Sequence, residues 1–180
     1  YNKFNSIGGT NVDNYVVAVD IHTGETLWTR ELLTPEGDRR SLSFAQVMYW
    51  DSFNVHGVFA YLWGTSGSRW DAFDPVDGRW LFAFTDVPGG STVVGPNGEL
   101  IRYQVNIAGG YMTMWNSTAV IDAYWGTTQN SPVWGSWRPN GKTINATGAV
   151  PVTSSTPFGL NGYQWNVSIP TGLTGSAADY

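Results

Sequence analysis

Residues 15–28 read YVVAVDIHTGETLW, a strand pattern followed by a glycine turn and a second strand pattern. Ala18 and Asp20 are two positions apart, so they lie on the same face of the first strand. Gly24 supplies the positive φ that a tight hairpin requires, because glycine has no Cβ that would clash. Trp28 opens the return strand. The segment therefore predicts a β-hairpin whose second strand carries a large aromatic side chain.

A second copy of this pattern occupies residues 70–82, which read WDAFDPVDGRWLF. The positions that correspond are Ala18 and Ala72, Asp20 and Asp74, Gly24 and Gly78, and Trp28 and Phe82. The distance between the two glycines is a little longer than the roughly 40–50 residues of common propeller blades. An internal repeat is therefore predicted.

A third, degenerate copy places Asn116 at the end of a first strand and Trp165 in a return strand over 163–169, after Gly162. This interpretation inserts about forty-five residues into one hairpin, which is long for a connection. In the alternative, Gly109-Gly110 forms the turn and another element begins after Trp115. We favour the insertion, because an aromatic residue followed by apolar residues, Pro and Gly recurs after all three hairpins.

The remaining strand patterns lie between the hairpins, at 44–50, 58–64, 91–94 and 99–107. Residues 127–157 are rich in Thr, Ser, Asn, Gly and Pro, which indicates a long surface loop. Residues 117–124 form the one predicted helical turn.

Together these patterns predict an all-β fold, a partial β-propeller of about three four-stranded antiparallel blades with a long loop insertion. Within a single domain, 1–180, the predicted parts are a blade end (1–40), a blade (41–90) and a blade (91–175) with an inserted loop (126–160).

The composition narrows the classes of function. The 180 residues carry a net charge of −5, with 13% charged and 15% aromatic residues. A nucleic-acid site needs clustered Lys and Arg to neutralise phosphates, and Arg39-Arg40 is the densest basic cluster. The chain has no cysteine, which removes disulfides, thiolate nucleophiles and Cys-ligated metals. No apolar run approaches the ~20 residues that span a bilayer. We expect neither nucleic-acid binding nor a membrane span in this segment.

The first motif, Ala18-x-Asp20-x-x-Thr23-Gly24-Glu25-x-x-Trp28, resembles the tryptophan-docking motif of quinoprotein (PQQ-type repeat) β-propellers. The second copy keeps the alanine, the aspartate and the glycine, with Asp77 for Thr and Phe82 for Trp. The resemblance implies a ring of four-stranded blades in which each motif tryptophan packs between neighbouring blades. The implied role of the motif is structural.

The same resemblance bears on catalysis. Quinone-dependent dehydrogenases of this type resemble one another further in adjacent cysteines, a Ca²⁺ site and a catalytic Asp. This chain has no cysteine and about three blades, whereas propellers typically have four to eight. We expect no catalytic residue, cofactor or metal, and a chain that is a piece of a longer protein or that self-associates through open blade edges.

Two groups of polar residues are candidates for a catalytic or metal site. Asp71, Asp74 and Asp77 invite a Ca²⁺ hypothesis, but strand residues three apart point to opposite faces, whereas Ca²⁺ needs six to eight converging oxygens. We expect Asp74 and Asp77 to bind turn backbone instead. His22 and His56 are far apart in the sequence, and a catalytic base needs a nucleophile or an orienting carboxylate within hydrogen-bond reach, so we expect no catalytic role for either.

Three N-glycosylation sequons begin at Asn116, Asn145 and Asn166. We favour Asn145, because it falls in the predicted loop. Trp125, Trp134 and Trp137 lie in or beside the same loop and are candidates for contact with a partner or a glycan.

The leading hypothesis is a non-catalytic, extracellular or cell-surface propeller module for binding or structural assembly, of which a surface-polymer subunit is one version. Its predicted partners are proteins or further copies of the chain, with N-linked glycans. The alternatives are a fragment of a quinone-dependent dehydrogenase and a carbohydrate-binding module.

Overall fold

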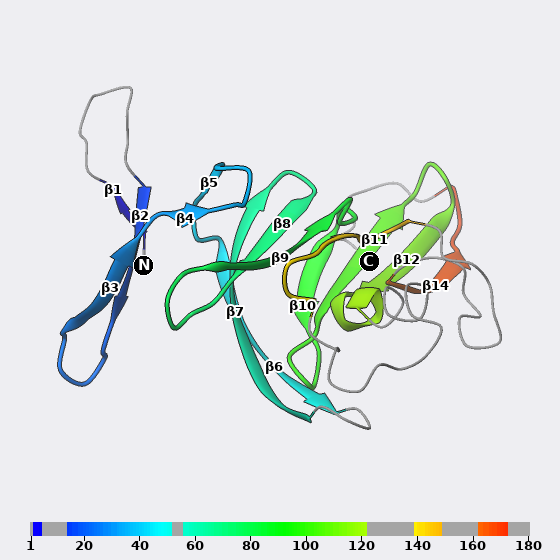
Figure 1. The fold of residues 1–180 in the computed structure, drawn as a ribbon. Coiled ribbons are helices and arrows are strands. Elements are labelled where there is room, and N and C mark those ends of the chain that lie inside the picture. Colours follow the sequence, from blue (N-terminus) through cyan, green and yellow to red (C-terminus); the bar gives the residue numbers. More distant parts are fainter. Residues whose placement is uncertain (1, 5–13, 52–55, 122–138, 149–161, 173–180) are drawn as a thin grey trace. The chain divides into compact units, whose positions relative to one another are not determined.

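The computed structural model describes residues 2–4, 14–51, 56–121, 139–148 and 162–172. Antiparallel strands are the main regular structure of these residues (Figure 1), so the predicted all-β class is confirmed. The chain divides into two compact units. One unit contains Tyr1–Thr85 and Arg138–Thr143, and the other contains Asp86–Trp137 and Ile144–Tyr180.

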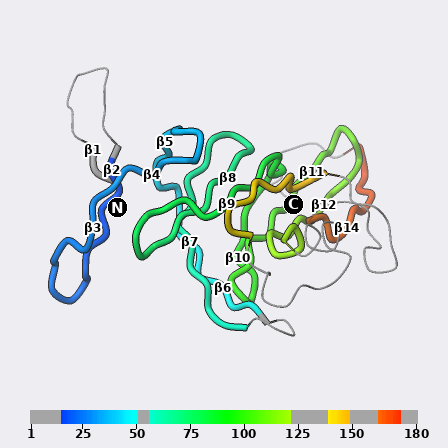
Figure 2. Tube along the Cα trace, in the orientation of Figure 1, coloured from blue at the N-terminus to red at the C-terminus, as the bar shows by residue number. Residues whose placement is uncertain are grey.

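The first unit begins with two small sheets. Strands β1 (Asn2–Phe4), β2 (Asn14–Val19) and β3 (Thr26–Arg30) form a three-stranded antiparallel sheet, and β4 (Leu32–Leu33) pairs with β5 (Arg39–Arg40). The β2–β3 hairpin is the predicted one, and Figure 2 traces the chain through its turn.

A larger sheet follows in the same unit. Strands β6 (Phe44–Asp51), β7 (His56–Ser66), β8 (Arg69–Phe73) and β9 (Trp80–Thr85) pair in sequence order, each antiparallel to the next. All four strands lie within residues 41–90, for which one four-stranded blade is predicted, and the blade assignment stays a prediction. A short strand, β13 (Thr143–Asn145), lies beside β9 and gives the order β13-β9-β8-β7-β6.

Aromatic side chains form the core on one face of this sheet. Trp63 and Phe82 are almost fully buried, and their ring centroids are 5.5 Å apart in an edge-to-face arrangement. The rings that surround them belong to Phe44, Tyr61, Trp70 and Phe84. Edge-to-face pairs add about 0.5–1.5 kcal/mol to the free energy gained from burial. The aromatic excess of the sequence is therefore used in part to build one sheet face.

The second unit contains one four-stranded antiparallel sheet, made of β10 (Ser91–Val94), β11 (Leu100–Asn106), β12 (Tyr111–Asn116) and β14 (Tyr163–Ser168). Because β12 pairs with β14, the long insertion within the third hairpin is confirmed. Gly109-Gly110 lies in the turn that joins β11 to β12. Residues 117–121 are helical, which confirms that part of the predicted helical turn; residues 122–124 lie outside the described residues.

The prediction of a surface loop over 127–157 is wrong for its described part, residues 139–148. Pro139, Ile144 and Ala146 are buried, and β13 lies in this stretch. Gly141 donates a backbone hydrogen bond to the Leu81 carbonyl, and Lys142 accepts one from the Ala83 amide. Turn-rich composition predicted a loop, but backbone pairing with β9 makes this stretch part of a sheet.

The described sheets have three, five, four and two strands, and all are open. A ring of equal four-stranded blades therefore stays a prediction. No helix among the described residues is long and apolar enough to cross a membrane.

Candidate functional site in the hairpin turns

The three motif hairpins share one irregularity of strand pairing. In each hairpin the register shifts directly after the residue that faces the aromatic side chain. The pairs at this position are Ala18 with Trp28, Ala72 with Phe82, and Met114 with Trp165. A bulge bends and twists its strand locally. Trp28, Phe82 and Trp165 therefore occupy equivalent positions in their three hairpins.

The first two turns share a backbone hydrogen-bond pattern, and in each the first aspartate caps amides of the turn. In the first turn, Asp20–Glu25, the Asp20 Oδ1 accepts bonds from the amides of His22 and Thr23 at 2.8 and 3.1 Å. In the second turn, residues 74–79, the Asp74 Oδ1 accepts one from the Val76 amide at 2.8 Å. These amides, His22 first and Thr23 second, lower the pKa of Asp20, because they stabilise its ionised form.

Glycine closes both turns. Gly24 and Gly78 have φ values of 75° and 71°, and each donates its amide to the carbonyl of the turn's first aspartate at 2.8 Å. In the third hairpin the Asn116 Oδ1 takes the capping role and accepts from the Thr118 amide at 2.9 Å. Gly162 lies one position nearer to Trp165 than Gly24 lies to Trp28 or Gly78 to Phe82. The backbone amide of Asn116 donates a hydrogen bond to the Gly162 carbonyl.

Trp28 docks on the second turn. Its indole nitrogen donates a hydrogen bond to the Pro75 carbonyl at 3.2 Å. A Cβ built on Gly78 would lie 3.4 Å from the Trp28 ring, so the indole rests directly on the glycine. Trp28 also packs on a small core that contains Val16 and Phe73. The tryptophan of one hairpin thus contacts the turn of the next hairpin along the chain.

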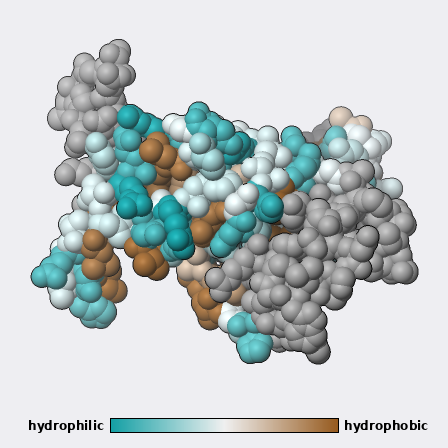
Figure 3. All heavy atoms as spheres, in the orientation of Figure 1, coloured by the Kyte–Doolittle hydropathy of each residue, from teal (hydrophilic) through white to brown (hydrophobic). Residues whose placement is uncertain are grey.

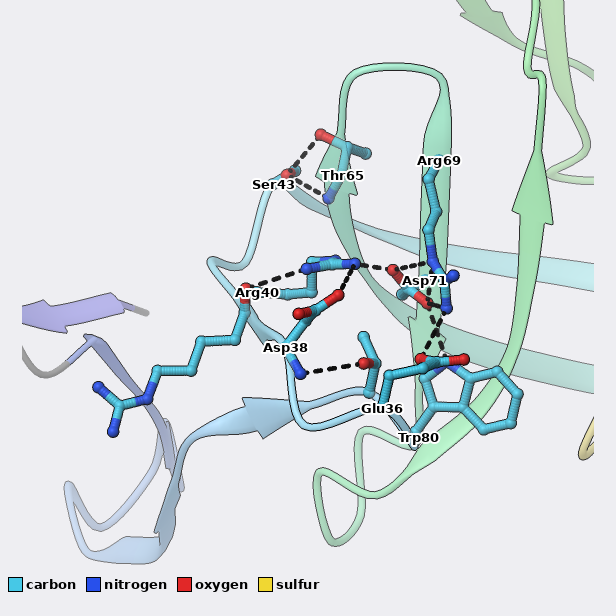
Figure 4. A network of polar contacts seen from close by, with 10 residues as sticks. Glu36, Asp38, Arg40, Ser43, Thr65, Arg69, Asp71 and Trp80 are labelled. Carbon is cyan, nitrogen blue, oxygen red and sulfur yellow. Dashed lines mark hydrogen bonds and ion pairs between the residues drawn. The ribbon is translucent and has the colours of Figure 1, made fainter.

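A buried carboxylate lies at the centre of a network of charged side chains in the first unit (Figure 4). Asp71 is fully buried and accepts hydrogen bonds from Arg40 Nε at 2.7 Å, from the Arg69 guanidinium at 3.0–3.2 Å and from Trp80 Nε1 at 3.0 Å. The hydrogen bonds that Arg69 donates to Asp71 raise the pKa of Arg69. Because both carboxylate oxygens are engaged, the geometry of Asp71 is that of a structural ion pair.

The surroundings of the network are tightly packed. A Cβ on Gly64 would lie 2.6 Å from the Arg40 Cβ, so strand β7 can pass Arg40 only at a glycine. Beyond the carboxylate, Arg40 contacts Asp38 at 3.4 Å and Arg69 contacts Glu36 at 3.2 Å. Sequence reasoning missed this network. Asp71 lies in a strand between Trp70 and Ala72, and a charge in such an apolar strand is the one signal that could have indicated a buried partner.

The three aspartates considered for Ca²⁺ do not converge. Asp71 binds the two arginines, Asp74 caps its turn, and Asp77 accepts the Arg79 amide at 3.0 Å. Among the described residues, no three or more His, Asp or Glu side chains gather into a group that could hold a metal ion. His22 is exposed in the first turn, 3.7 Å from the Asp20 carboxylate, and His56 begins β7.

The three sequons lie in different settings. Asn166 is exposed on β14, a terminal strand of its sheet. Asn145 is also exposed, but it lies in β13 and not in a loop, and its amide nitrogen donates to Asp86 at 2.8 Å. Asn116 is half-buried, and its Oδ1 also accepts from the Thr118 hydroxyl at 2.8 Å. Asn166 is therefore exposed like Asn145, but it differs from Asn145 in that its side chain makes no hydrogen bond to another described residue.

Trp125, Trp134 and Trp137 fall outside the described residues, so their predicted contact role stays a prediction. Comparison of the chain with protein-family models, with curated proteins and with solved structures gives no match. The proposed function therefore depends on the contacts of the hairpin turns.

Proposed function

We propose that this chain is a β-propeller-type module that serves binding or structural assembly at the cell surface or outside the cell. The observation that carries the proposal is the contact of Trp28 with Pro75 and Gly78. In this contact the aromatic residue of one hairpin packs on the turn of the next, as the resemblance to quinoprotein repeats implies for neighbouring blades.

The charged groups support a structural role. Asp71 is buried against two arginines and an indole, which leaves its carboxylate oxygens occupied. Removing one partner of such an ion pair costs about 3–5 kcal/mol, because the remaining charge is stranded without water. Asp74 and Asp77 are turn residues with backbone partners. Asp71, Asp74 and Asp77 thus stabilise the fold.

Export is the part of the proposal that can be tested directly. We would purify the chain from its source, separate the surface and intracellular fractions, and measure intact mass before and after deglycosylation. The proposal expects the chain in the surface or secreted fraction, with a mass loss that maps to one or more of Asn116, Asn145 and Asn166. An unmodified chain confined to the intracellular fraction would contradict it.

The same preparation tests the quinone-dependent alternative. Adding the quinone and Ca²⁺ to the purified protein should produce no dye-linked alcohol oxidation and no saturable quinone fluorescence quenching. Saturable binding together with oxidation would replace the structural proposal with the enzymatic one.

A further inference from the structure

The β10–β14 sheet carries an apolar surface on one face. Tyr103, Met114 and Trp165 are directly opposite one another across β11, β12 and β14, and Val105, Met112 and Val167 form the next row. We call these six residues the Trp165 face. Val105 and Val167 are 41% and 46% exposed, and the other four side chains are half-buried. On the opposite face Thr113 and Trp115 are buried, whereas Asn166 on the terminal strand β14 is exposed. An antiparallel sheet that is covered on one side normally carries polar residues on the other, so this apolar face needs an explanation.

Trp165 has the same strand position as the docking residue Trp28, and in its own sheet it packs beside Tyr103 with ring centroids 6.0 Å apart. It is paired with Met114 as Trp28 is paired with Ala18, and the same register shift follows both pairs. Trp28 shows what a tryptophan at this position does: it lies on a glycine of positive φ and donates to a turn carbonyl. By position, Trp165 is a second copy of the same device.

The chain also carries a turn on which such a tryptophan could dock. The first turn repeats the backbone hydrogen-bond pattern and the aspartate cap of the second turn, with Gly24 at the place of Gly78 and Ile21 at the place of Pro75. A Cβ built on Gly78 would meet Trp28, whereas one built on Gly24 meets no atom within 4 Å. Ile21 is 91% exposed and Leu27 is 65% exposed. Figure 3 shows hydrophobic surface on the β2–β3 hairpin, to which Ile21 and Leu27 belong.

We propose that two copies of this chain associate head to tail, with the Trp165 face of one copy on the first turn of the other. In this contact the Trp165 indole lies on Gly24 of the second copy and donates its N–H to the Ile21 carbonyl. The contact repeats the one between Trp28 and the second turn, and the chain supplies both halves of it. Because the two surfaces differ, the contact is heterologous and can continue into a ring or a filament.

This inference rests on the proposed role in assembly and names the surfaces that would perform it. Sedimentation velocity of the purified chain across a concentration series should show species larger than the monomer. Trp165→Ala and Gly24→Val should each raise the apparent Kd by at least about tenfold. The first removes a buried tryptophan anchor, which is among the costliest interface residues to lose, and the second fills the place where the indole lies.

The decisive experiment mixes the two variants. Trp165→Ala keeps an intact first turn and Gly24→Val keeps an intact Trp165 face, so an equimolar mixture should form a one-to-one dimer although each variant alone is monomeric. Ile21→Pro, which copies the second turn, should preserve association, because the carbonyl acceptor remains. Gly37→Val is the matched control: Gly37 also has a positive φ, of 90°, and no atom within 4 Å of a built Cβ, but it lies outside the first turn.

Three results would overturn the inference: a wild-type chain that stays monomeric up to about millimolar concentration, the scale of weak affinities; a mixture that does not dimerise while circular dichroism shows both variants folded; or an equal effect of Gly37→Val. Each of these would leave the export test of the proposed function unaffected, so the two failures are distinguishable.

Discussion

The indole nitrogen of Trp28 donates a hydrogen bond to the carbonyl oxygen of Pro75, which lies 47 residues further along the chain, at 3.2 Å. This bond joins the three-stranded β1–β3 sheet to the turn between β8 and β9. The same indole rests on Gly78, so one side chain combines a directional contact with apolar burial. The first unit therefore depends on Trp28 more than its half-buried position suggests.

Two substitutions of Trp28 separate these contributions. Trp28→Phe keeps a ring on Gly78 but removes the N–H donor, and should lower the free energy of unfolding by about 1 kcal/mol. Trp28→Ala also removes the packing on Gly78 and the small core, and should cost about 2–3 kcal/mol. Urea denaturation followed by circular dichroism measures both values. Equal losses for the two variants would show that ring packing contributes nothing.

A pair of glycine substitutions tests whether the second turn is a docking surface. Gly24 and Gly78 have nearly equal positive φ values, so Gly→Ala imposes similar backbone strain of about 1 kcal/mol at each. Only at Gly78 would the added Cβ also meet neighbouring atoms, because it would lie 3.3 Å from the Arg30 Cδ and 3.4 Å from the Trp28 ring. We expect the thermal midpoint of unfolding to fall further for Gly78→Ala than for Gly24→Ala. The reverse order would contradict the docking interpretation.

Asp71 is predicted to be the most sensitive charged residue of the first unit. Asp71→Asn removes the charge that two guanidinium groups share in a buried site, and should destabilise the fold by about 3–5 kcal/mol. Asp38→Asn is the matched control, because Asp38 contacts the same Arg40 but its side chain is 62% exposed. Its effect should stay within about 1 kcal/mol. Chemical denaturation of both variants at neutral pH provides the comparison.

The first turn should make stability depend on acid. The folded-state pKa of Asp20 lies below its ordinary value of 3.8, because its ionised form accepts amide hydrogen bonds from His22 and Thr23. Stability from this group is present above pH 3.8 and is lost as the pH falls through the lower folded-state value. The Asp20→Asn variant should therefore lose less stability than the wild type between neutral pH and pH 3, in denaturation curves at stepped pH. Parallel curves would exclude a contribution from Asp20.

The motif hairpins were predictable because their signals are local. A glycine with positive φ, an aspartate that caps amides within three residues and strand alternation are all properties of neighbouring residues, as Asp20 and Gly24 show. The third hairpin was predictable from the recurrence of its aromatic return strand, although its insertion separates Trp115 from its strand partner Tyr163.

The features that local sequence patterns do not predict involve residues far apart in the chain. Residues 139–148 look like a loop by composition, yet Lys142 and Gly141 hydrogen-bond to β9, a strand more than fifty residues earlier. The same composition predicts that the Asn145 sequon lies in a loop, whereas Asn145 lies in β13. No local rule predicts such pairing, because it depends on which strand has a free backbone edge.

The sequence alone determined the all-β class, the three hairpins and their turn glycines, since alternation, turn propensity and backbone sterics act over a few residues. The tertiary structure decided that Trp28 contacts Pro75, that Asp71 collects Arg40 and Arg69, and that β13 extends the larger sheet. Each of these contacts forms only when distant segments are brought together, and the free energy of burial that brings them together belongs to the whole fold.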